Sequence, residues 1–222
     1  MLVCGVDEAG RGCIIGPLVI CGVLLEEEDI PRLVSLGVKD SKLLSEKARE
    51  RIEKELKSFV KYSIVVISPK DVDKSVLSKE GDNLNWLEAV KTAEIINSLK
   101  PDVAFVDCPS NNVKAYNSFL VSKVKGKVDI RTEHKADMKY AIVGAASIIA
   151  KVARDNEIKS IKKNINVDFG SGYMSDAKTA EFLKKNWSKY PEIFRHSWTP
   201  YQVLAGEKKQ KRIGDFGGLR KE

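Results

Sequence analysis

Two apolar segments of strand length open the chain, separated by a turn that contains glycines. The first runs from Leu2 to Val6 and the second from Pro17 to Leu25, with the sequence PLVICGVLL. Apolar runs of this length between turn residues are typical of buried strands. The connection is short enough for a hairpin, so we expect the two strands to pair. The N-terminus lacks a basic region, and we read it as the first strand rather than a signal peptide.

The remaining pattern predicts three further strands and four helices. The strands are Tyr62–Ile67, Val103–Val106 and Val128–Thr132, and the helices are one capped by Ser45 through about Leu56, one capped by Asp82 or Asn83 through about Leu99, a long buried one opened by Asp137 through about Ile161, and a short one from Ser175 to Asn186. An opening hairpin followed by mixed elements predicts an α/β layered domain with a mixed sheet.

Length and composition fit one sizeable domain with at most a small appendage. The chain has 222 residues, of which 43% are hydrophobic and 31% charged, as in ordinary globular proteins. It contains no apolar run of 18 residues, so we expect no membrane span. Four cysteines show no metal-finger spacing, which predicts reduced, buried thiols in a cytoplasmic protein.

The net charge of +7 is concentrated near the C-terminus. From residue 171 to the end, 11 Lys and Arg stand against 6 Asp and Glu, whereas the rest of the chain has 27 against 25. A near-neutral body with a basic C-terminal quarter favours a polyanionic partner such as nucleic acid. A lysine-rich surface that only confers solubility is an equally good interpretation of the charge alone.

The first strand ends in two adjacent carboxylates, Asp7 and Glu8, followed by the turn Gly10-Arg11-Gly12. An acid at the end of a buried strand is costly unless it is paired or bound to a metal. The two glycines free backbone donors, and the guanidinium suits phosphate or carbonyl oxygens. The stretch therefore indicates phosphodiester chemistry, with a solvated surface turn as the simpler alternative.

Four acids stand at positions where a sheet can bring them together. Asp7 and Glu8 end the first strand, Asp107 ends the fourth, and Asp137 begins the long helix. Carboxylates so close repel one another unless cations are bound, and oxygen ligands favour Mg²⁺ or Mn²⁺. Two such ions can flank a scissile phosphate. Taken singly, Asp137 is also explained as a helix cap and Asp107 as a turn residue.

Several segments in order resemble the signature segments of ribonuclease HII, most closely its archaeal members. They are DEAGRG, the KDSK loop, VDCP, EHKAD followed by AASIIAKVARD, and GSGYMSD. The resemblance spans residues 2 to about 201. It implies an RNase H-like mixed five-stranded sheet flanked by helices in residues 1–165, and a small helical C-terminal domain with a basic tail in residues 166–222.

The resemblance also implies an activity and its residues. The activity is two-metal-ion cleavage of the RNA strand of RNA–DNA hybrids and of DNA at embedded ribonucleotides, giving 5′-phosphate and 3′-hydroxyl ends, in replication and ribonucleotide excision repair. The catalytic acids fall on Asp7, Glu8, Asp107 and Asp137, the junction-reading turn on Gly10, Arg11 and Gly12, and a substrate-sensing tyrosine on Tyr173. We expect a monomer.

Three lysines and Tyr173 complete the candidate substrate residues, and two of these four have simpler interpretations. Lys39, Lys42 and Lys151 are candidates for phosphate contact, but Lys151 lies late in the buried helix and could instead pair with an acid of the site. For Tyr173 the residues alone favour a packed ring with a satisfied hydroxyl.

The tail resembles a sliding-clamp-binding box at Gln210, Ile213 and Phe216, although Gly217 replaces the usual second aromatic residue. A basic tail without such a partner is the interpretation we favour.

Two other functions compete with the nuclease. One is a nucleic-acid-binding domain without chemistry, which the four acids oppose because they repel phosphate. The other is a two-metal enzyme acting on DNA, which the Gly-Arg-Gly turn and Tyr173 oppose only through the resemblance.

Overall fold

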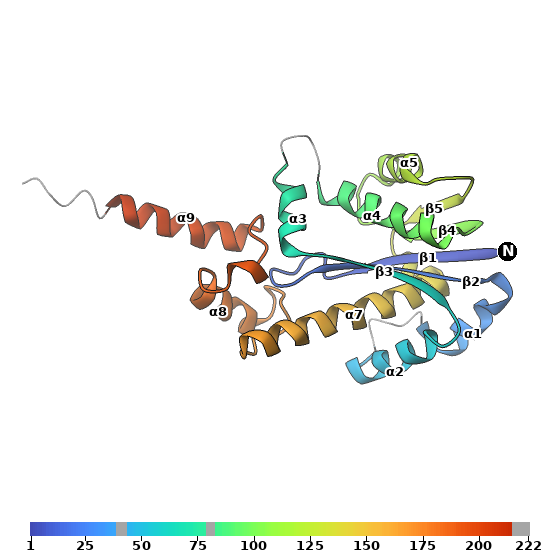
Figure 1. The fold of residues 1–222 in the computed structure, drawn as a ribbon, viewed down its shortest axis with the longest axis horizontal. Helices are drawn as coiled ribbons and strands as arrows, with labels where there is room; N and C mark the ends of the chain where they lie inside the picture. The colour runs from blue at the N-terminus through green and yellow to red at the C-terminus, as the bar shows by residue number, and fades with distance from the viewer. Residues whose placement is uncertain (39–43, 79–82, 215–222) are drawn as a thin grey trace, which may run out of the picture.

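The computed structural model describes residues 1–38, 44–78 and 83–214, with side chains up to residue 206. Its centre is a five-stranded sheet with the strand order β3-β2-β1-β4-β5 (Figure 1). The strands are β1 (Leu2–Ala9), β2 (Leu18–Glu26), β3 (Lys61–Ile67), β4 (Val103–Asp107) and β5 (Asp129–Glu133). All five were predicted, with ends that differ by at most three residues.

The sheet is mixed, as the sequence predicted. β1 and β2 form an antiparallel hairpin in which Leu2 faces Glu26, and β3 extends it antiparallel on the far side of β2. β4 pairs with β1 in parallel, with Val6 beside Val106, and β5 continues in parallel beyond β4. The carboxyl ends of β1 and β4 therefore lie at the same edge of the sheet.

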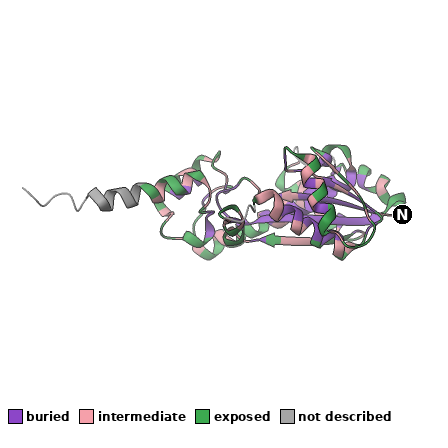
Figure 2. Cartoon of the chain, turned by 90° about the horizontal axis from the view of Figure 1, so that it is seen from above, coloured by how far each residue is buried: buried purple, intermediate pink, exposed green. Residues whose placement is uncertain are grey.

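Helices cover both faces of the sheet (Figure 1). They are α1 (Ile30–Ser35), α2 (Glu46–Leu56), α3 (Pro69–Val76), α4 (Leu84–Leu99), α5 (Val113–Lys123), α6 (Ala136–Lys139), α7 (Ala141–Ile165), α8 (Ala177–Asn186) and α9 (Thr199–Gly214), with short 3₁₀ turns η1 (Glu27–Asp29) and η3 (Pro191–Ile193). α7, α2 and α1 pack against one face, and α4 and α5 against the other. β1, β2 and the first half of α7 carry the longest runs of buried residues (Figure 2).

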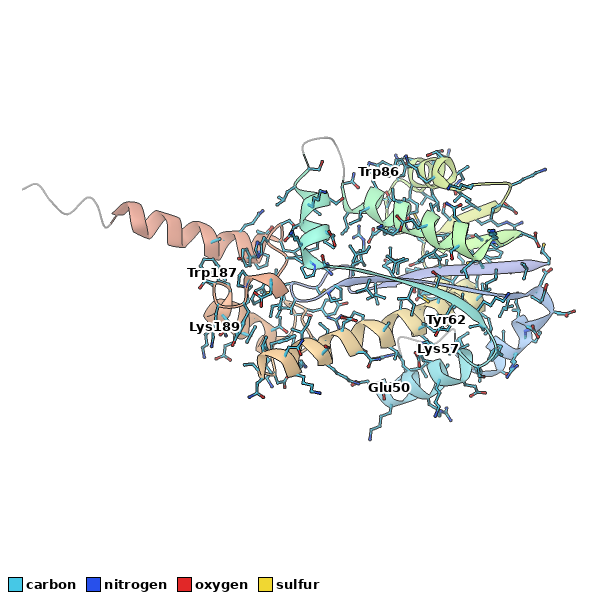
Figure 3. The ribbon with its side chains drawn as sticks, in the orientation of Figure 1. Glu50, Lys57, Tyr62, Trp86, Trp187 and Lys189 are labelled. Carbon is cyan, nitrogen blue, oxygen red and sulfur yellow. The ribbon has the colours of Figure 1, made fainter. Side chains whose placement is uncertain are left out.

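The two predicted N-caps of α2 and α4 are confirmed. Ser45 Oγ accepts a hydrogen bond from the Ala48 N–H at 3.2 Å, and Asn83 Oδ1 accepts one from the Trp86 N–H at 3.2 Å. The buried face of α4 includes two polar residues, Glu88 and Thr92. Trp86 packs against Phe119 of α5, with ring centroids 4.5 Å apart (Figure 3).

Asp137 does not begin the long helix as predicted. It lies in the separate short helix α6, and the backbone at Tyr140 is extended before α7 starts at Ala141. α7 is buried over its first ten residues, as its apolar sequence indicated. α6 lies beside the end of β4, where Asp107 accepts a hydrogen bond from the Ala136 N–H at 2.7 Å.

Besides the apolar clusters on the two faces of the sheet, a third lies at the end of the sheet where β1 leads into β2. It joins Ile14 and Ile15 of that connection to Phe169, Phe182 and Phe194 of the C-terminal part. Ile15 and Phe194 also form an isolated antiparallel bridge. A domain boundary at residue 165 coincides with the end of α7 and stays a prediction.

No helix among the described residues is long and apolar enough to span a membrane. All four cysteines are buried and free of disulfides, as predicted.

Candidate active site

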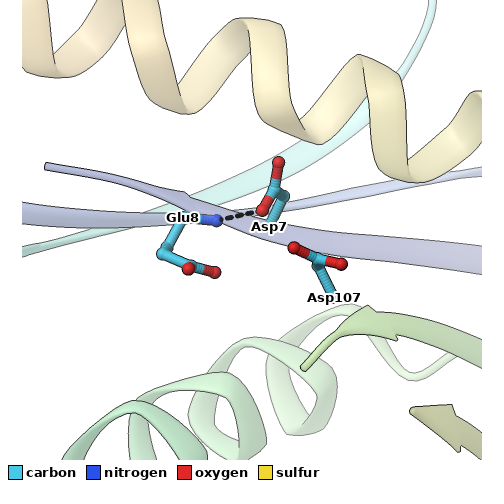
Figure 4. A group of neighbouring side chains, drawn as sticks. All are labelled: Asp7, Glu8 and Asp107. Atoms are coloured by element: carbon cyan, nitrogen blue, oxygen red, sulfur yellow. Dashed lines mark hydrogen bonds between the residues drawn. The ribbon is translucent and has the colours of Figure 1, made fainter. Parts of the chain in front are cut away.

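Three of the four predicted acids meet at the edge of the sheet where β1 and β4 end. One carboxylate oxygen from each of Asp7, Glu8 and Asp107 lies within 4.8 Å of the other two (Figure 4). The register explains the meeting, because Asp7 and Asp107 directly follow the paired residues Val6 and Val106 of neighbouring parallel strands. The Glu8 N–H donates to Asp7 Oδ1 at 2.8 Å, which fixes the Asp7 carboxylate at the centre of the group.

Burial makes negative charge costly at this edge. Asp7 is only 6% exposed, and burial raises its pKa from 3.8 to about 6, against the lowering effects of Ser147 and Lys151. Burial, followed by the charge of Asp7, raises the pKa of Glu8 well above its ordinary value. Carboxylates held close in a poorly solvated site are stabilised as anions when a cation binds between them. An oxygen-only donor set of this kind fits a hard divalent metal.

The acids lie in a cavity of about 510 Å³ that also contains the fourth predicted acid. Asp137 is 4% exposed and lines this cavity, although it is not among the three whose oxygens meet within 4.8 Å. Lys151 lines it as well, and its Nζ donates to Ser147 Oγ one turn earlier on α7. Of the predicted residues, the cavity thus contains the four acids, Lys151 and Tyr173.

The packing requires glycine at the first glycine position of the predicted turn but not at the second. Gly10 has φ +82°, and a Cβ there would lie 2.6 Å from the Pro17 carbonyl oxygen, so the fold itself requires glycine. A Cβ on Gly12 would meet no protein atom within 4 Å, and its φ is not in the left-handed region. Nothing in the packing around Gly12 thus requires glycine.

A buried arginine holds this turn from behind. Arg195 is 0% exposed and donates hydrogen bonds to the carbonyl oxygens of Gly10 and Arg11, both at 2.6 Å, and of Gly16 at 3.2 Å. The Ile14 N–H donates to the Gly172 carbonyl at 2.9 Å. The C-terminal part of the chain thus fixes the position of the turn relative to the acids.

The Arg11 side chain is anchored on α4. Its Nε donates to Glu88 Oε1 at 2.9 Å, and its Nη2 donates to Asn85 Oδ1 at 2.8 Å. Glu88 is 2% exposed, and burial raises its pKa to about 7 although the charge of Arg11 opposes that rise. Removing either partner would leave the other polar group poorly compensated, so the pair fixes the orientation of the guanidinium.

Tyr173 lines the acid cavity. Arg154 of α7 stacks under it, with the guanidinium carbon 4.8 Å from the ring centroid, and Arg154 Nη2 donates to the Ser171 carbonyl at 2.6 Å. Burial raises the pKa of the Tyr173 hydroxyl. The ring is therefore held by its contact with Arg154 and is only partly buried, rather than packed in a core.

Two predicted lysines and the predicted tail motif cannot be placed. Lys39, Lys42 and Phe216 lie outside the described residues, and the side chains of Gln210 and Ile213 do as well.

Sequence reasoning missed the basic and acidic residues that support the site. Arg49, Arg154 and Asp155 line the acid cavity, and Arg49 Nη2 lies 3.3 Å from Asp155 Oδ2. Arg154 and Asp155 belong to the quoted AKVARD segment, so a signal was present without a role. Glu88 is a charged residue on the buried face of α4, and this alone could have marked it as a candidate. The sequence around Arg195 gives no indication of its contacts.

Comparison with known proteins places this geometry in a family. The family model for ribonuclease HII matches residues 4–201. Ribonuclease HII of Methanocella arvoryzae is 41% identical over 215 residues, which cover 96% of this chain and 95% of the relative.

Two solved structures are similar over nearly the whole chain. The crystal structure of ribonuclease H2 from Pyrococcus horikoshii OT3 has a TM-score of 0.85 at 40% identity, covering 94% of this chain and 99% of that one. The structure of the complex of PCNA with RNase HII from Archaeoglobus fulgidus has a TM-score of 0.82 at 41% identity, covering 90% of this chain and 96% of that one.

Proposed function

The chain belongs to the ribonuclease HII family of metal-dependent endonucleases, which cleave RNA in RNA–DNA hybrids, and we propose that it also incises DNA at single embedded ribonucleotides by two-metal-ion catalysis. The observation that carries the proposal is the meeting of three carboxylates within 4.8 Å beside a turn whose second glycine faces open space. The acids suit the metal ions, and the turn suits a ligand that must come close.

All four acids are proposed as metal ligands. Asp7, Glu8 and Asp107 offer oxygens close enough to share a cation, and Asp137 extends the set from α6 in the same cavity. Mg²⁺ or Mn²⁺ bound there lowers the pKa of an attacking water and neutralises charge on the scissile phosphate. Lys151 and Arg49 add positive charge to the same cavity, which favours binding of a phosphate.

Selection of the ribonucleotide is assigned to the turn and to Tyr173. The 2′-hydroxyl is the local mark that distinguishes RNA from DNA. The backbone of Gly12 can approach that hydroxyl because no Cβ intervenes. Tyr173, held by Arg154, is proposed to stack on the next sugar. Cleavage is proposed to leave 5′-phosphate and 3′-hydroxyl ends.

The test is cleavage of a duplex with one ribonucleotide in otherwise all-DNA strands, beside an all-DNA duplex and an RNA–DNA hybrid, each with Mg²⁺, Mn²⁺ or chelator. We expect a metal-dependent nick 5′ to the ribonucleotide and no cut in all-DNA. Cleavage of the hybrid alone would restrict the enzyme to hybrids, and cleavage of all-DNA would remove the role of the 2′-hydroxyl.

We also propose a sliding clamp as a partner of the tail. RNase HII from Archaeoglobus fulgidus forms a complex with PCNA, and Gln210, Ile213 and Phe216 of this chain follow a clamp-binding pattern. A tail peptide should bind the clamp in a titration, and a peptide with alanine at Ile213 and Phe216 should not. Equal binding of the two peptides to the clamp would mean that the tail does not bind the clamp through these residues. The monomeric state and cytoplasmic location remain predictions.

A further inference from the structure

A second hollow, of about 460 Å³, begins at Arg11. The lining of the acid cavity includes Ala9, directly before the turn of residues 10–12, and the lining of the second hollow includes Arg11 within that turn. Among the described residues, the two linings share no member. The turn is therefore next to both hollows, and Arg11 is its residue in the second one.

Four separate segments build this second hollow, and hydrogen bonds join them in two pairs. The turn contributes Arg11, α3 contributes Val76, the start of α4 contributes Asn83, Leu84 and Asn85, and the segment entering α9 contributes Ser197, Trp198 and Thr199. Asn85 accepts a hydrogen bond from Arg11 at 2.8 Å. Asp73 of α3 accepts one from the Ser197 N–H, also at 2.8 Å. The shape of the hollow is therefore defined by hydrogen bonds on both of its sides.

The chemistry of the lining suits a sugar–phosphate backbone. It combines a guanidinium, two amides, two hydroxyls and an indole with the aliphatic side chains of Val76 and Leu84, and the described residues of the lining include no carboxylate. Arginine, asparagine, serine and threonine are side chains that commonly contact phosphate and sugar oxygens in nucleic-acid complexes. The acid cavity next to it has the opposite character, with Asp7, Glu8, Asp107 and Asp137 in its lining.

The position of the hollow follows the geometry of a duplex. The 2′-hydroxyls lie in the minor groove, so a turn that reads one of them must enter that groove. One strand then lies on each side of the turn. With the ribonucleotide strand over the acids, the complementary strand faces the side on which Arg11 lies.

We propose that this second hollow binds the sugar–phosphate backbone of the uncut DNA strand, with Asn83, Thr199 and the exposed part of Arg11 as its contacts. Asn83 and Thr199 are exposed, and the Arg11 side chain is 38% exposed. The two hydrogen bonds of Arg11 to α4 use Nε and Nη2, so Nη1 is the nitrogen that they leave for a phosphate. The inference rests on the proposed function, because it needs the duplex to straddle the turn.

Two variants test the hollow without touching the acids. Asn83→Asp keeps a good N-cap for α4 and adds one negative charge to the hollow. Thr199→Val removes a hydroxyl and keeps the shape of the side chain. Ser122→Asp adds the same charge at an exposed position near the end of α5 and serves as the control. All are compared on the single-ribonucleotide duplex, together with a scan in which methylphosphonates neutralise the phosphates of the uncut strand one at a time.

We expect one or two neutral linkages to raise the KM of the wild type roughly fivefold, since each removes a phosphate contact. Asn83→Asp should raise KM roughly tenfold on the charged duplex and less than twofold on the duplex neutral at that position, with kcat unchanged. Wild-type KM in both variants, or the same penalty on charged and neutral duplexes, would overturn the inference. If the wild type cuts no single-ribonucleotide duplex, the proposed function fails, and fluorescence anisotropy on the same duplexes in chelator still decides whether the hollow binds the uncut strand.

Discussion

Replacing Asp7 by asparagine should stabilise the metal-free protein while it abolishes cleavage. The Asp7 carboxylate is 6% exposed, and burial raises its pKa from 3.8 to about 6. A raised carboxyl pKa means that the folded state holds its proton more tightly than the unfolded state, so folding becomes less favourable as the pH rises between these two values.

The magnitude follows from the pKa. A rise from 3.8 to about 6 corresponds to about 3 kcal/mol of stability lost by the wild type at neutral pH. The amide introduced by Asp7→Asn keeps an acceptor for the Glu8 N–H, but it is not matched to every neighbour, so we expect a net gain of about 1 to 3 kcal/mol. For a chain of this length that raises Tm by about 3 to 8 °C.

The assay is thermal unfolding in chelator at pH 7.5 and at pH 4.5. At pH 7.5 Asp7→Asn should melt higher than the wild type, and the difference should shrink at pH 4.5, where the wild-type carboxyl is mostly protonated. Mg²⁺ or Mn²⁺ should stabilise the wild type and have little effect on the variant. An equal or lower Tm for Asp7→Asn at pH 7.5 would refute the reasoning about a strained, buried anion.

Four further substitutions test the packing of the turn and of α7, and one of them also tests cleavage. Gly12→Ala should leave Tm within about 1 °C of the wild type and lower cleavage at least tenfold. Gly10→Ala should lower Tm itself, because the backbone of Gly10 has a positive φ. Equal Tm values for the two variants would contradict this. Gly144→Ala should destabilise the protein by roughly 1 to 3 kcal/mol in urea unfolding despite the higher helix propensity of alanine, because its Cβ would lie 2.7 Å from the Val38 carbonyl oxygen. Arg195→Met removes the charged donor to the carbonyl oxygens of Gly10 and Arg11 and should cost about 2 to 4 kcal/mol in the same assay. A cost under about 1 kcal/mol would mean that the turn is held by other contacts.

Local pattern was sufficient for the strands and for the meeting of the acids. Alternation of apolar segments and turns located β1 and β2, and the assumption that β1 and β4 are neighbours brought Asp7 to Asp107, which the parallel register confirms. That argument works because the sequence itself shows which residues end an apolar strand. A carboxylate at such an end can be identified as a candidate site residue without knowledge of its partners in the fold.

Helices with weak local signals were not predicted. α1 has six residues, and the Ser68-Pro69 pair that starts α3 was read only as the end of a strand, although Ser68 accepts a hydrogen bond from the Asp71 N–H at 3.1 Å as an N-cap. The Asn112 cap of α5 was likewise read as loop. Serine, proline and asparagine begin turns and helices alike, so short elements depend on packing for their assignment.

Residues whose role comes from distant contacts could not be predicted at all. Arg195 lies 185 positions from Gly10 in the turn that it holds, and Glu88 lies 77 positions from Arg11. Asp137 lines the acid cavity but lies one helix earlier than predicted, because the extended residue Tyr140 interrupts a sequence that otherwise favours a continuous helix. Such positions require the tertiary structure.

The measurement that tests the central claim most directly is Mn²⁺ binding, followed by the EPR signal of free Mn²⁺, for the wild type, Asp107→Asn and the exposed control Asp129→Asn. The claim is that Asp7, Glu8 and Asp107 hold the metal on which cleavage depends. It predicts saturable binding by the wild type and by Asp129→Asn, with at least tenfold weaker binding by Asp107→Asn. Equal affinity of all three proteins for Mn²⁺ would contradict it and move the metal away from the end of β4.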